Sequence, residues 1–353
     1  MSLRRQRAGR RGYSSTAGLH FDDEEFESRI VWIWGTARSG STWLLHMLSH
    51  PLKLEWSKEP QDLLGFVAPR SWQGTVDAIP VDTTFVSNHL LPSFGPADYT
   101  DDLAPVTVYS ALDMRDRGNF FFSPKYEDAW HPEVRRMMLV RFHRIVERTA
   151  EHYDVKSPLV LLKETSGAHA APLVMSMFPR SRLVFLVRDG RDMVDSHVAA
   201  SQPGGWLPQR GWATPEERRQ FIRRWARTWV GDMASIERAF EAHPPELRKM
   251  LRYEDLLAAP ASNLGSLVEW LGLRRSERWL EGTVRANAFD SIAPEQKGPK
   301  KFFRSATPGA WRKNMTDEEA ATLESIMGGK LRELGYPVTD GSPAPVKRAG
   351  RRR

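Results

Sequence analysis

The chain has 353 residues, of which 41% are hydrophobic and 27% charged, so it can bury one large core or two small ones. It contains no cysteine, which excludes disulfides, thiolate metal sites and a cysteine nucleophile. No stretch approaches the roughly 18 apolar residues that a membrane-spanning helix needs.

The net charge of +7 is concentrated at the two ends of the chain. Basic residues cluster in 4–11 and again in 347–353. We interpret both ends as disordered tails that favour solubility. Attraction to nucleic acid or to a membrane is the alternative. The basic N-terminus is not followed by an apolar stretch, so it does not read as a secretory signal.

The folded part is predicted to begin near Ser28, after a tail over residues 1–27 that ends in an acidic run. Residues 30–34 are apolar, β-branched or aromatic, which predicts a buried strand. Residues 35–40 form a loop with glycine at both ends, and leucine spacing predicts a helix over 41–48. A strand, such a loop and a helix together favour anion binding, because loop N–H groups and the helix dipole point at the ligand.

The loop has the spacing of a Walker A motif, G-x-x-x-x-G-K-[ST], but lacks its lysine. Ser41 stands at the lysine position, Thr42 follows it, and the basic residue Arg38 lies inside the loop. The Walker lysine contacts the β- and γ-phosphates, so its absence argues against a hydrolysed nucleoside triphosphate. An arginine in the loop suits a bidentate contact with one phosphate or phosphosulfate. The alternative is an ordinary turn with Ser41 as a helix cap.

Beyond the first helix, the sequence predicts alternating helices and strands. Residues 61–130 mix proline, glycine and aromatic residues, and we interpret them as an irregular insertion that supplies walls of a substrate pocket. Strands are predicted at 158–163, 182–187 and 248–253, and helices at 133–152, 168–178, 192–200, 214–240, 262–271, 275–285 and 317–334. This alternation indicates one α/β domain over 28–340, with a central parallel sheet flanked by helices and a tail at 341–353.

A second strand–turn–helix unit begins with the predicted strand 182–187, and Arg188 stands where that strand ends. Ser196 follows eight residues later, in the next helix. Ligands of parallel α/β sheets bind at the carboxyl ends of the strands, so Arg188 is placed to meet the same ligand as the first loop. An arginine together with a hydroxyl suits a phosphate dianion.

These two segments resemble the cofactor-binding motifs of sulfotransferases that use 3′-phosphoadenosine 5′-phosphosulfate (PAPS). Residues 36–43 are similar to the family's 5′-phosphosulfate loop, P-[KR]-S-G-[TS]-[TS]-[WL], with Ala37 in place of proline. Residues 188–196 are similar to its 3′-phosphate segment, R-[DN]-[PG]-[KR]-D-x-x-x-S. Residues 251–256 resemble its Y-E-D strand end. The alternative is an ordinary strand-to-helix cap with no ligand contact. The resemblance covers about residues 30–335 and implies a P-loop NTPase-like sulfotransferase fold.

A late segment, residues 300–316, resembles the family's R-K-G-x-x-G-x-W-[KR] loop, which closes over the 3′-phosphate. Ser305 and Ala306 replace the lysine and glycine of that motif. The resemblance implies a phosphate contact for Arg304, with the lysines at 300–301 as substitutes. A solvated basic loop is the alternative.

The resemblance implies roles for the matching residues. It places the 5′-phosphosulfate at Arg38, Ser39, Gly40, Ser41 and Thr42, the 3′-phosphate at Arg188, Ser196 and Arg304, and Trp43 near the adenine. We expect in-line sulfuryl transfer to a hydroxyl or amine of a small-molecule, glycan or lipid acceptor. A sulfuryl group carries less charge than a phosphoryl group, so no metal ion is expected, and no convincing metal-ligand spacing is found.

The base that removes the acceptor proton must lie within hydrogen-bond reach. We choose Glu59, which follows Arg38 by 21 residues. A glutamate at a similar distance serves heparan- and tyrosylprotein-type sulfotransferases, which this segment resembles. Glu164 and His89 are the alternatives.

Small-molecule cytosolic sulfotransferases instead carry a histidine base in a K-T-H-L segment. Here residues 162–166 keep the lysine as Lys163, but no histidine follows at the matching place. The resemblance therefore implies that Lys163 stabilises the bridging oxygen of the leaving group.

Two rival functions are a P-loop kinase and a nucleic-acid-binding protein. The kinase would use Asp189 as a metal-binding carboxylate, but the missing Walker lysine and the pair of Arg188 and Ser196 argue against it. The nucleic-acid-binding protein would use the basic tails and show steep salt dependence. Golgi members of the family begin with a membrane anchor, and this chain shows none, so we expect a cytoplasmic enzyme.

Overall fold

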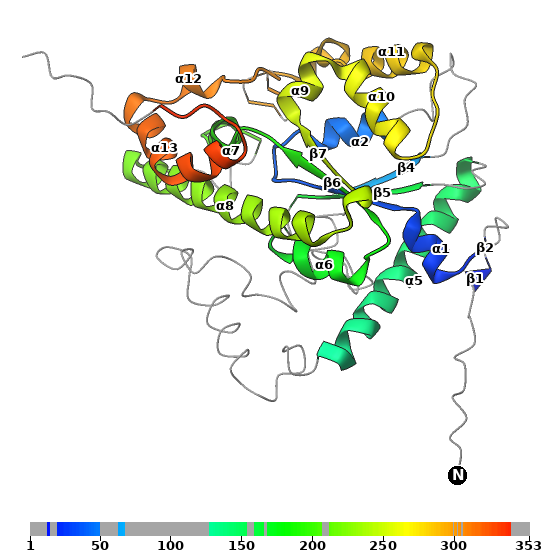
Figure 1. Cartoon of the computed structure of the whole chain (residues 1–353). Coiled ribbons are helices and arrows are strands. Elements are labelled where there is room, and N and C mark those ends of the chain that lie inside the picture. Colours follow the sequence, from blue (N-terminus) through cyan, green and yellow to red (C-terminus); the bar gives the residue numbers. More distant parts are fainter. Residues whose placement is uncertain are drawn as a thin grey trace, which may run out of the picture.

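A parallel sheet of five strands, ordered β4-β5-β3-β6-β7, forms the centre of the computed structural model (Figure 1). The structure describes residues 13–14, 20–49, 63–67, 127–153, 159–165, 168–206, 212–298, 300–301, 303–304 and 306–339. The strands are β3 (Ile30–Trp34), β4 (Leu63–Val67), β5 (Leu159–Glu164), β6 (Arg182–Val187) and β7 (Arg248–Arg252). Two short strands, β1 (Tyr13–Ser14) and β2 (His20–Phe21), pair antiparallel outside this sheet.

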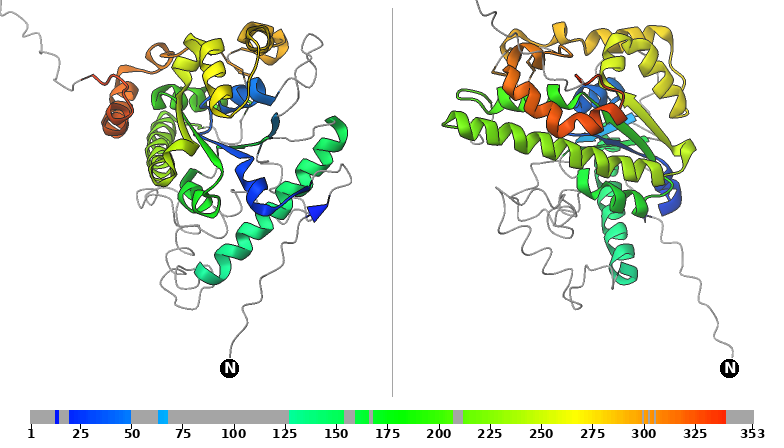
Figure 2. Two further views of the ribbon diagram at one scale, coloured as in Figure 1. Left: turned by 45° about the vertical axis from the view of Figure 1, so that its right-hand side comes forward. Right: turned by 60° about the vertical axis from the view of Figure 1, so that its left-hand side comes forward.

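Helices cover both faces of the sheet in the two further views (Figure 2). They are α1 (Asp23–Ser28), α2 (Ser41–Ser49), α5 (Glu127–Tyr153), α6 (Ala171–Met177), α7 (Gly190–Ser201), α8 (Pro215–Ala242), α9 (Tyr253–Ala258), α10 (Pro260–Trp270), α11 (Glu277–Ala286), α12 (Trp311–Asn314) and α13 (Asp317–Glu333). The short 3-10 helices are η6 (Ala168–Ala170), η8 (Pro245–Leu247), η9 (Phe289–Ser291) and η10 (Pro294–Gln296).

The side chains of the central strand β3 alternate between two hydrophobic cores. Trp32 and Trp34 belong to the core that α5, α6, α7, α8 and α13 complete. Val31 and Ile33 belong to the core that α2, α10 and α11 complete. All five residues of β3 are buried, which explains why its sequence is a continuous apolar run rather than an alternating one.

The strand register brings the carboxyl ends of the strands to one edge of the sheet. Trp34 of β3 pairs with Glu164 of β5 on one side and with Phe185 of β6 on the other. Val187 of β6 pairs in turn with Arg252 of β7. The loop after β3 and the turns after the neighbouring strands therefore lie side by side, where parallel α/β sheets bind ligands.

The predicted α/β architecture is confirmed, and several boundaries agree closely. Strand β6 has the predicted bounds. Helix α8 begins within one residue of its predicted start: Thr214 caps it, Pro215 occupies its first position, and Glu217 completes a capping box. Within α8, Trp229 is fully buried.

Helix α1 corrects the predicted start of the folded domain. Asp22 caps this helix, and the acidic run expected to be a tail forms its first turn, where carboxylates interact favourably with the helix dipole. Phe26 stacks on His143 of α5 at 3.7 Å between ring centroids. The buried carboxylate of Glu27 accepts hydrogen bonds from Arg135 Nη2 (2.5 Å) and Arg180 N (2.7 Å). The folded domain therefore includes residues before Ser28.

Two further elements differ from the predictions. Strand β4 lies inside 61–130, where an irregular insertion with short helices, and no strand, was expected. It is added to the sheet by parallel pairing with β5, which no local pattern reveals. Helix α5 begins at Glu127, six residues before the predicted start at Glu133, and Pro132 lies inside it. Glu59, His89 and the tail at 341–353 lie outside the described residues. None of the helices in the described ranges is both long and apolar enough to cross a membrane.

Candidate active site

The loop between β3 and α2 turns through two left-handed residues, Arg38 (φ +70°) and Gly40 (φ +91°). A side chain at Gly40 would place its Cβ atom 2.4 Å from the ring of Tyr253, so glycine is required here for both conformation and space. The carbonyl oxygen of Gly40 accepts from Leu44 N (3.0 Å) and so starts helix α2. The amino end of α2, with Ser41 and Thr42, consequently faces the edge of the sheet described above.

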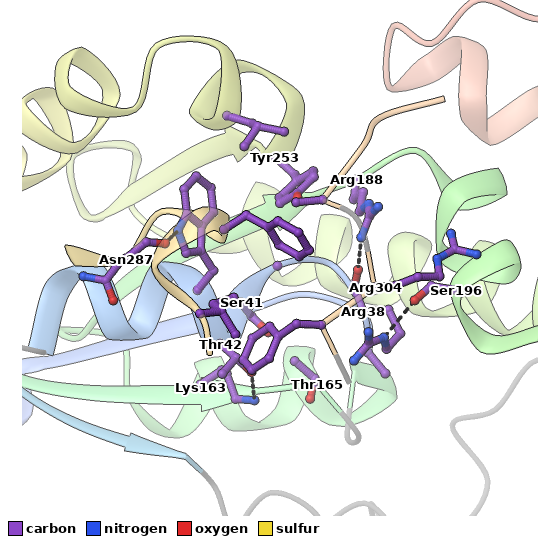
Figure 3. Close-up of a pocket in the computed structure, with 18 of the residues that line it drawn as sticks. Arg38, Ser41, Thr42, Lys163, Thr165, Arg188, Ser196, Tyr253, Asn287 and Arg304 are labelled. Atoms are coloured by element: carbon purple, nitrogen blue, oxygen red, sulfur yellow. Dashed lines mark hydrogen bonds between the residues drawn. The ribbon is translucent and has the colours of Figure 1, made fainter. Parts of the chain in front are cut away.

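A cavity of about 530 Å³ lies at this edge (Figure 3). Its walls include these residues named from the sequence: Arg38, Gly40, Ser41, Thr42, Trp43, Lys163, Arg188, Ser196 and Arg304. Four segments distant in sequence thus meet at one site. Ser39 is fully buried inside the loop, and its hydroxyl has no hydrogen-bond partner among the described residues. Neither Lys300 nor Lys301 lines the cavity.

Arg38 and Arg188 connect the two predicted phosphate-binding segments. Arg38 Nε donates to Ser196 Oγ at 2.9 Å, and Arg188 Nη1 donates to the carbonyl oxygen of Arg38 at 2.7 Å. The buried Nε of Arg188 has no hydrogen-bond partner among the described residues. Burial, followed by the charges of Arg188 and Arg304, lowers the pKa of Arg38 to about 10. Three guanidinium groups in one cavity favour an anionic ligand, which would stabilise their charge.

Lys163 reaches the first turn of α2 from the end of β5. Its Nζ atom donates to Thr42 Oγ1 at 3.1 Å, and the side chain is buried. The ammonium group therefore lies beside the helix end that faces the cavity.

Arg304 lies at the cavity and forms an ion pair with the buried Asp195. Ala306, at the glycine position of the resembling loop motif, has φ +48°. The backbone thus keeps a conformation that glycine favours, although the residue type differs. Ser305 lies outside the described residues.

One part of the cavity is aromatic. Trp43 and Tyr253 meet edge to face with centroids 5.9 Å apart, and Trp43 Nε1 donates to the carbonyl oxygen of Asn287 (2.9 Å). Phe289 and Phe303 also line this part. Tyr253 lies in the segment 251–256 that resembles the family's Y-E-D strand end, but no cofactor contact was predicted for it. Such a contact could have been predicted, because Tyr253 follows the last strand at the ligand-binding edge. Phe289 and Phe303 were given no role from the sequence.

Asp189 has a different role from the metal ligand of the kinase alternative. Its carboxylate binds the fully buried Arg191 through Oδ1 (3.0 Å, from Nε) and Oδ2 (2.8 Å, from Nη2). Glu324 accepts from Arg191 Nη1 at 2.8 Å. Asp189 does not line the cavity, and within the described ranges no three histidine or acidic side chains form a potential metal site. Asp189 is therefore part of a structural ion-pair network.

One carboxylate and one imidazole line the cavity. Glu164 and His197 border the cavity, and His197 stacks on Trp225 with ring centroids 3.6 Å apart. Asp232 of α8 lies near Glu164, and burial, followed by the charge of Glu164, raises the pKa of Asp232 to about 8. Glu164 is thus the one candidate base that the described residues place at the cavity.

Comparison with known proteins gives a consistent match. The sequence model of the sulfotransferase family matches residues 31–277. Flavonol 4′-sulfotransferase of Flaveria chlorifolia is 27% identical over 119 residues, which are 29% of this chain and 35% of that protein. The mouse sulfotransferase SULT7A1 complexed with PAP aligns over 91% of this chain and 94% of its own, with 12% identity and a TM-score of 0.48. Retinol dehydratase in complex with androsterone and PAP aligns over 92% and 90%, with 14% identity and a TM-score of 0.49.

Proposed function

This chain belongs to the sulfotransferase family, and from that premise we propose that it transfers the sulfuryl group of PAPS to a hydroxyl or amine of an acceptor. The observation that carries the proposal is that one cavity holds two groups of anion-binding side chains. Ser41, Thr42 and Lys163 form the first, and Arg188, Ser196 and Arg304 form the second. PAPS carries two separate anionic groups, the 5′-phosphosulfate and the 3′-phosphate, one for each group of side chains.

The first group would hold the 5′-phosphosulfate. The N–H groups at the start of α2 and the hydroxyls of Ser41 and Thr42 are donors to an anion at a helix amino end. Lys163, already hydrogen-bonded to Thr42, would donate to the oxygen that bridges phosphorus and sulfur. That oxygen gains negative charge as the S–O bond breaks, so a fixed cation there lowers the barrier.

The second group would hold the 3′-phosphate. The Nε atom of Arg188 is buried and has no hydrogen-bond partner in the described part of the chain. We propose that it donates to an oxygen of the 3′-phosphate. Ser196 and Arg304 line the same region. In the aromatic part of the cavity, Trp43, Tyr253 and Phe289 offer ring surfaces for the adenine.

In the reaction that we propose, the acceptor oxygen attacks the sulfur atom as the bond to the bridging oxygen breaks. Glu59 takes the acceptor proton, and the products are the sulfated acceptor and 3′-phosphoadenosine 5′-phosphate (PAP). Arg38, within the loop, would bind the equatorial sulfuryl oxygens through its guanidinium. The in-line geometry depends on holding donor and acceptor at adjacent positions in the cavity.

For the acceptor we propose a small molecule with a hydroxyl group. The flavonol sulfotransferase from Flaveria chlorifolia suggests phenols as the first compounds to test. Aromatic side chains at the cavity, among them Trp206 and Phe303, could pack against such a ring. Glycans and lipids complete the acceptor panel.

The test is a transfer assay with the full chain, radiolabelled PAPS and this panel, in buffer containing a chelator. We expect label in at least one acceptor and release of PAP. Glu59→Gln should lower kcat about 10²- to 10⁴-fold, the usual contribution of a general base, without changing PAP binding. Glu55→Gln, four residues earlier, is the matched control. Consumption of ATP with magnesium, and no transfer from PAPS, would favour the kinase alternative.

A further inference from the structure

We propose that Asp195 is a positioning residue for nucleotide binding: its carboxylate holds Arg304 in the orientation that receives the 3′-phosphate. This inference rests on the proposed function, since it assumes that the anion at this end of the cavity is the 3′-phosphate of PAPS.

Asp195, on α7, contacts both ends of segment 304–314: Arg304 at its start and Asn314 at its end. Its side chain is 2% exposed, and its Oδ2 atom accepts from Arg304 Nη2 and, at 2.9 Å, from Asn314 Nδ2. Asp195 directly precedes Ser196, whose hydroxyl accepts from Arg38 Nε. The carboxylate of Asp195 therefore holds Arg304 near Ser196, another member of the second group of anion-binding side chains.

Asp192, one helical turn earlier on α7, holds the backbone of the same segment. Its Oδ2 accepts from Gly309 N at 2.6 Å, and its Oδ1 accepts from Trp311 N at 3.2 Å. Residues three apart on a helix lie on one face, so both carboxylates point at segment 304–314. Asp192 fixes the path of the backbone, and Asp195 fixes the guanidinium at its start.

The charges explain why Arg304 needs such a partner. Arg38 and Arg188 already place two guanidinium groups at the cavity, and the pKa of Arg38 is lowered by Arg304 as well as by burial and Arg188. A third cation beside them is repelled in the ligand-free protein and would turn toward water without a counter-charge. Asp195 offsets that repulsion.

The geometry leaves Arg304 able to bind a second anion. A guanidinium has five N–H groups, and the described contacts engage Nη2 with Asp195. Arg304 is 16% exposed and lines the cavity, on the same side as Arg38 and Ser196 in Figure 3. The remaining N–H groups can therefore meet a phosphate while Asp195 keeps the side chain in place.

The sign of the effect of Asp195→Asn separates positioning from a simple charge effect. A buried carboxylate near a phosphate dianion repels it, so removing only that charge would tighten PAP binding. If Asp195 positions Arg304, the same change releases the arginine and weakens binding. The two accounts predict opposite directions.

The experiment is calorimetry on the full chain with PAP and with adenosine 5′-phosphate, which lacks the 3′-phosphate. We expect Asp195→Asn to weaken PAP about tenfold, the value of one charge-assisted hydrogen bond, and to leave adenosine 5′-phosphate unchanged. The KM for PAPS should rise with kcat retained. In an Arg304→Ala background, Asp195→Asn should no longer weaken PAP. Asp290→Asn, the same substitution at an exposed position near the cavity, should have no such effect.

Three results would overturn the inference: PAP binding as tight as in the wild type, an equal loss for both nucleotides, or a loss that persists without Arg304. If Asp195→Asn does not fold, Asp195→Glu decides, because it keeps the charge but shifts the carboxylate. The inference then requires a smaller loss confined to PAP, and unaltered PAP binding contradicts it. A wild-type protein with no preference for PAP over adenosine 5′-phosphate would instead contradict the proposed function itself.

Discussion

The carboxylate of Glu254 accepts a hydrogen bond from the backbone N–H of Asp189 at 3.0 Å, directly after Arg188. Its second oxygen accepts from the hydroxyl of Tyr336 at 2.9 Å. The turn after β7 thereby supports the turn after β6, from which Arg188 projects into the cavity. A residue outside the cavity thus fixes the direction of one that lines it.

Glu254→Ala should destabilise the protein and weaken PAP binding. It leaves the Asp189 N–H and the Tyr336 hydroxyl without an acceptor, which costs about 1–3 kcal/mol for each such buried group. Urea unfolding measures the first effect and calorimetry the second. Glu254→Gln keeps one acceptor oxygen and should lose less. An alanine variant as stable as the wild type would show that this contact does not support the turn.

Gly40→Ala should abolish nucleotide binding. The left-handed conformation (φ +91°) costs a non-glycine residue about 1–2 kcal/mol, and the new methyl group would meet the Tyr253 ring at 2.4 Å. Gly329→Ala in α13, where a Cβ atom has nothing within 4 Å, is the control and should be neutral or slightly stabilising. Equal PAP affinity in both variants would contradict the role of the loop.

Lys163→Met should lower kcat much more than it weakens PAP binding. The lysine is proposed to meet charge that develops in the transition state, and removing such a donor costs about 10²- to 10³-fold in kcat. Transfer kinetics with saturating acceptor measure this loss. Lys313→Met, at an exposed position, serves as the control. A change in KM for PAPS with kcat intact would assign Lys163 to ground-state binding alone.

Asp232→Asn should remove a pH dependence of stability. The pKa of Asp232 rises from 3.8 in the unfolded chain to about 8 in the folded one, because of burial and the charge of Glu164. Between these values the folded state holds a proton that the unfolded state lacks, so the free energy of unfolding falls as pH rises and levels off above the folded value. The asparagine variant should therefore gain stability over the wild type from acid to neutral pH. A difference in the free energy of unfolding between variant and wild type that is the same at about pH 5, 7 and 9 would refute the shift.

Local sequence predicted the elements that have local causes. The apolar run of β3, the glycine-bounded loop and the start of α8 each depend on neighbouring residues, and all are present. The spacing of Arg188 and Ser196 also placed both at the cavity, because the carboxyl ends of parallel strands share one edge.

Other features depend on contacts between distant segments and could not be predicted. Strand β4 exists through its pairing with β5. The role that we propose for Asp195 depends on its contact with Arg304, 109 residues later. Helix α1 has a polar sequence, and a single aromatic residue, Phe26, anchors it through stacking on His143. No periodic pattern in the sequence marks such pairings.

The most direct test of the account is calorimetry of PAP binding in magnesium-free buffer, beside ATP and adenosine 5′-phosphate, for the wild type and Arg188→Ala. We expect PAP to bind at micromolar concentration or tighter, with a preference that depends on the 3′-phosphate. That preference should disappear in Arg188→Ala, because Arg188 supplies the buried donor at that end of the cavity. No binding of PAP, or tighter binding of ATP once magnesium is added, would contradict the assignment of the cavity to PAPS.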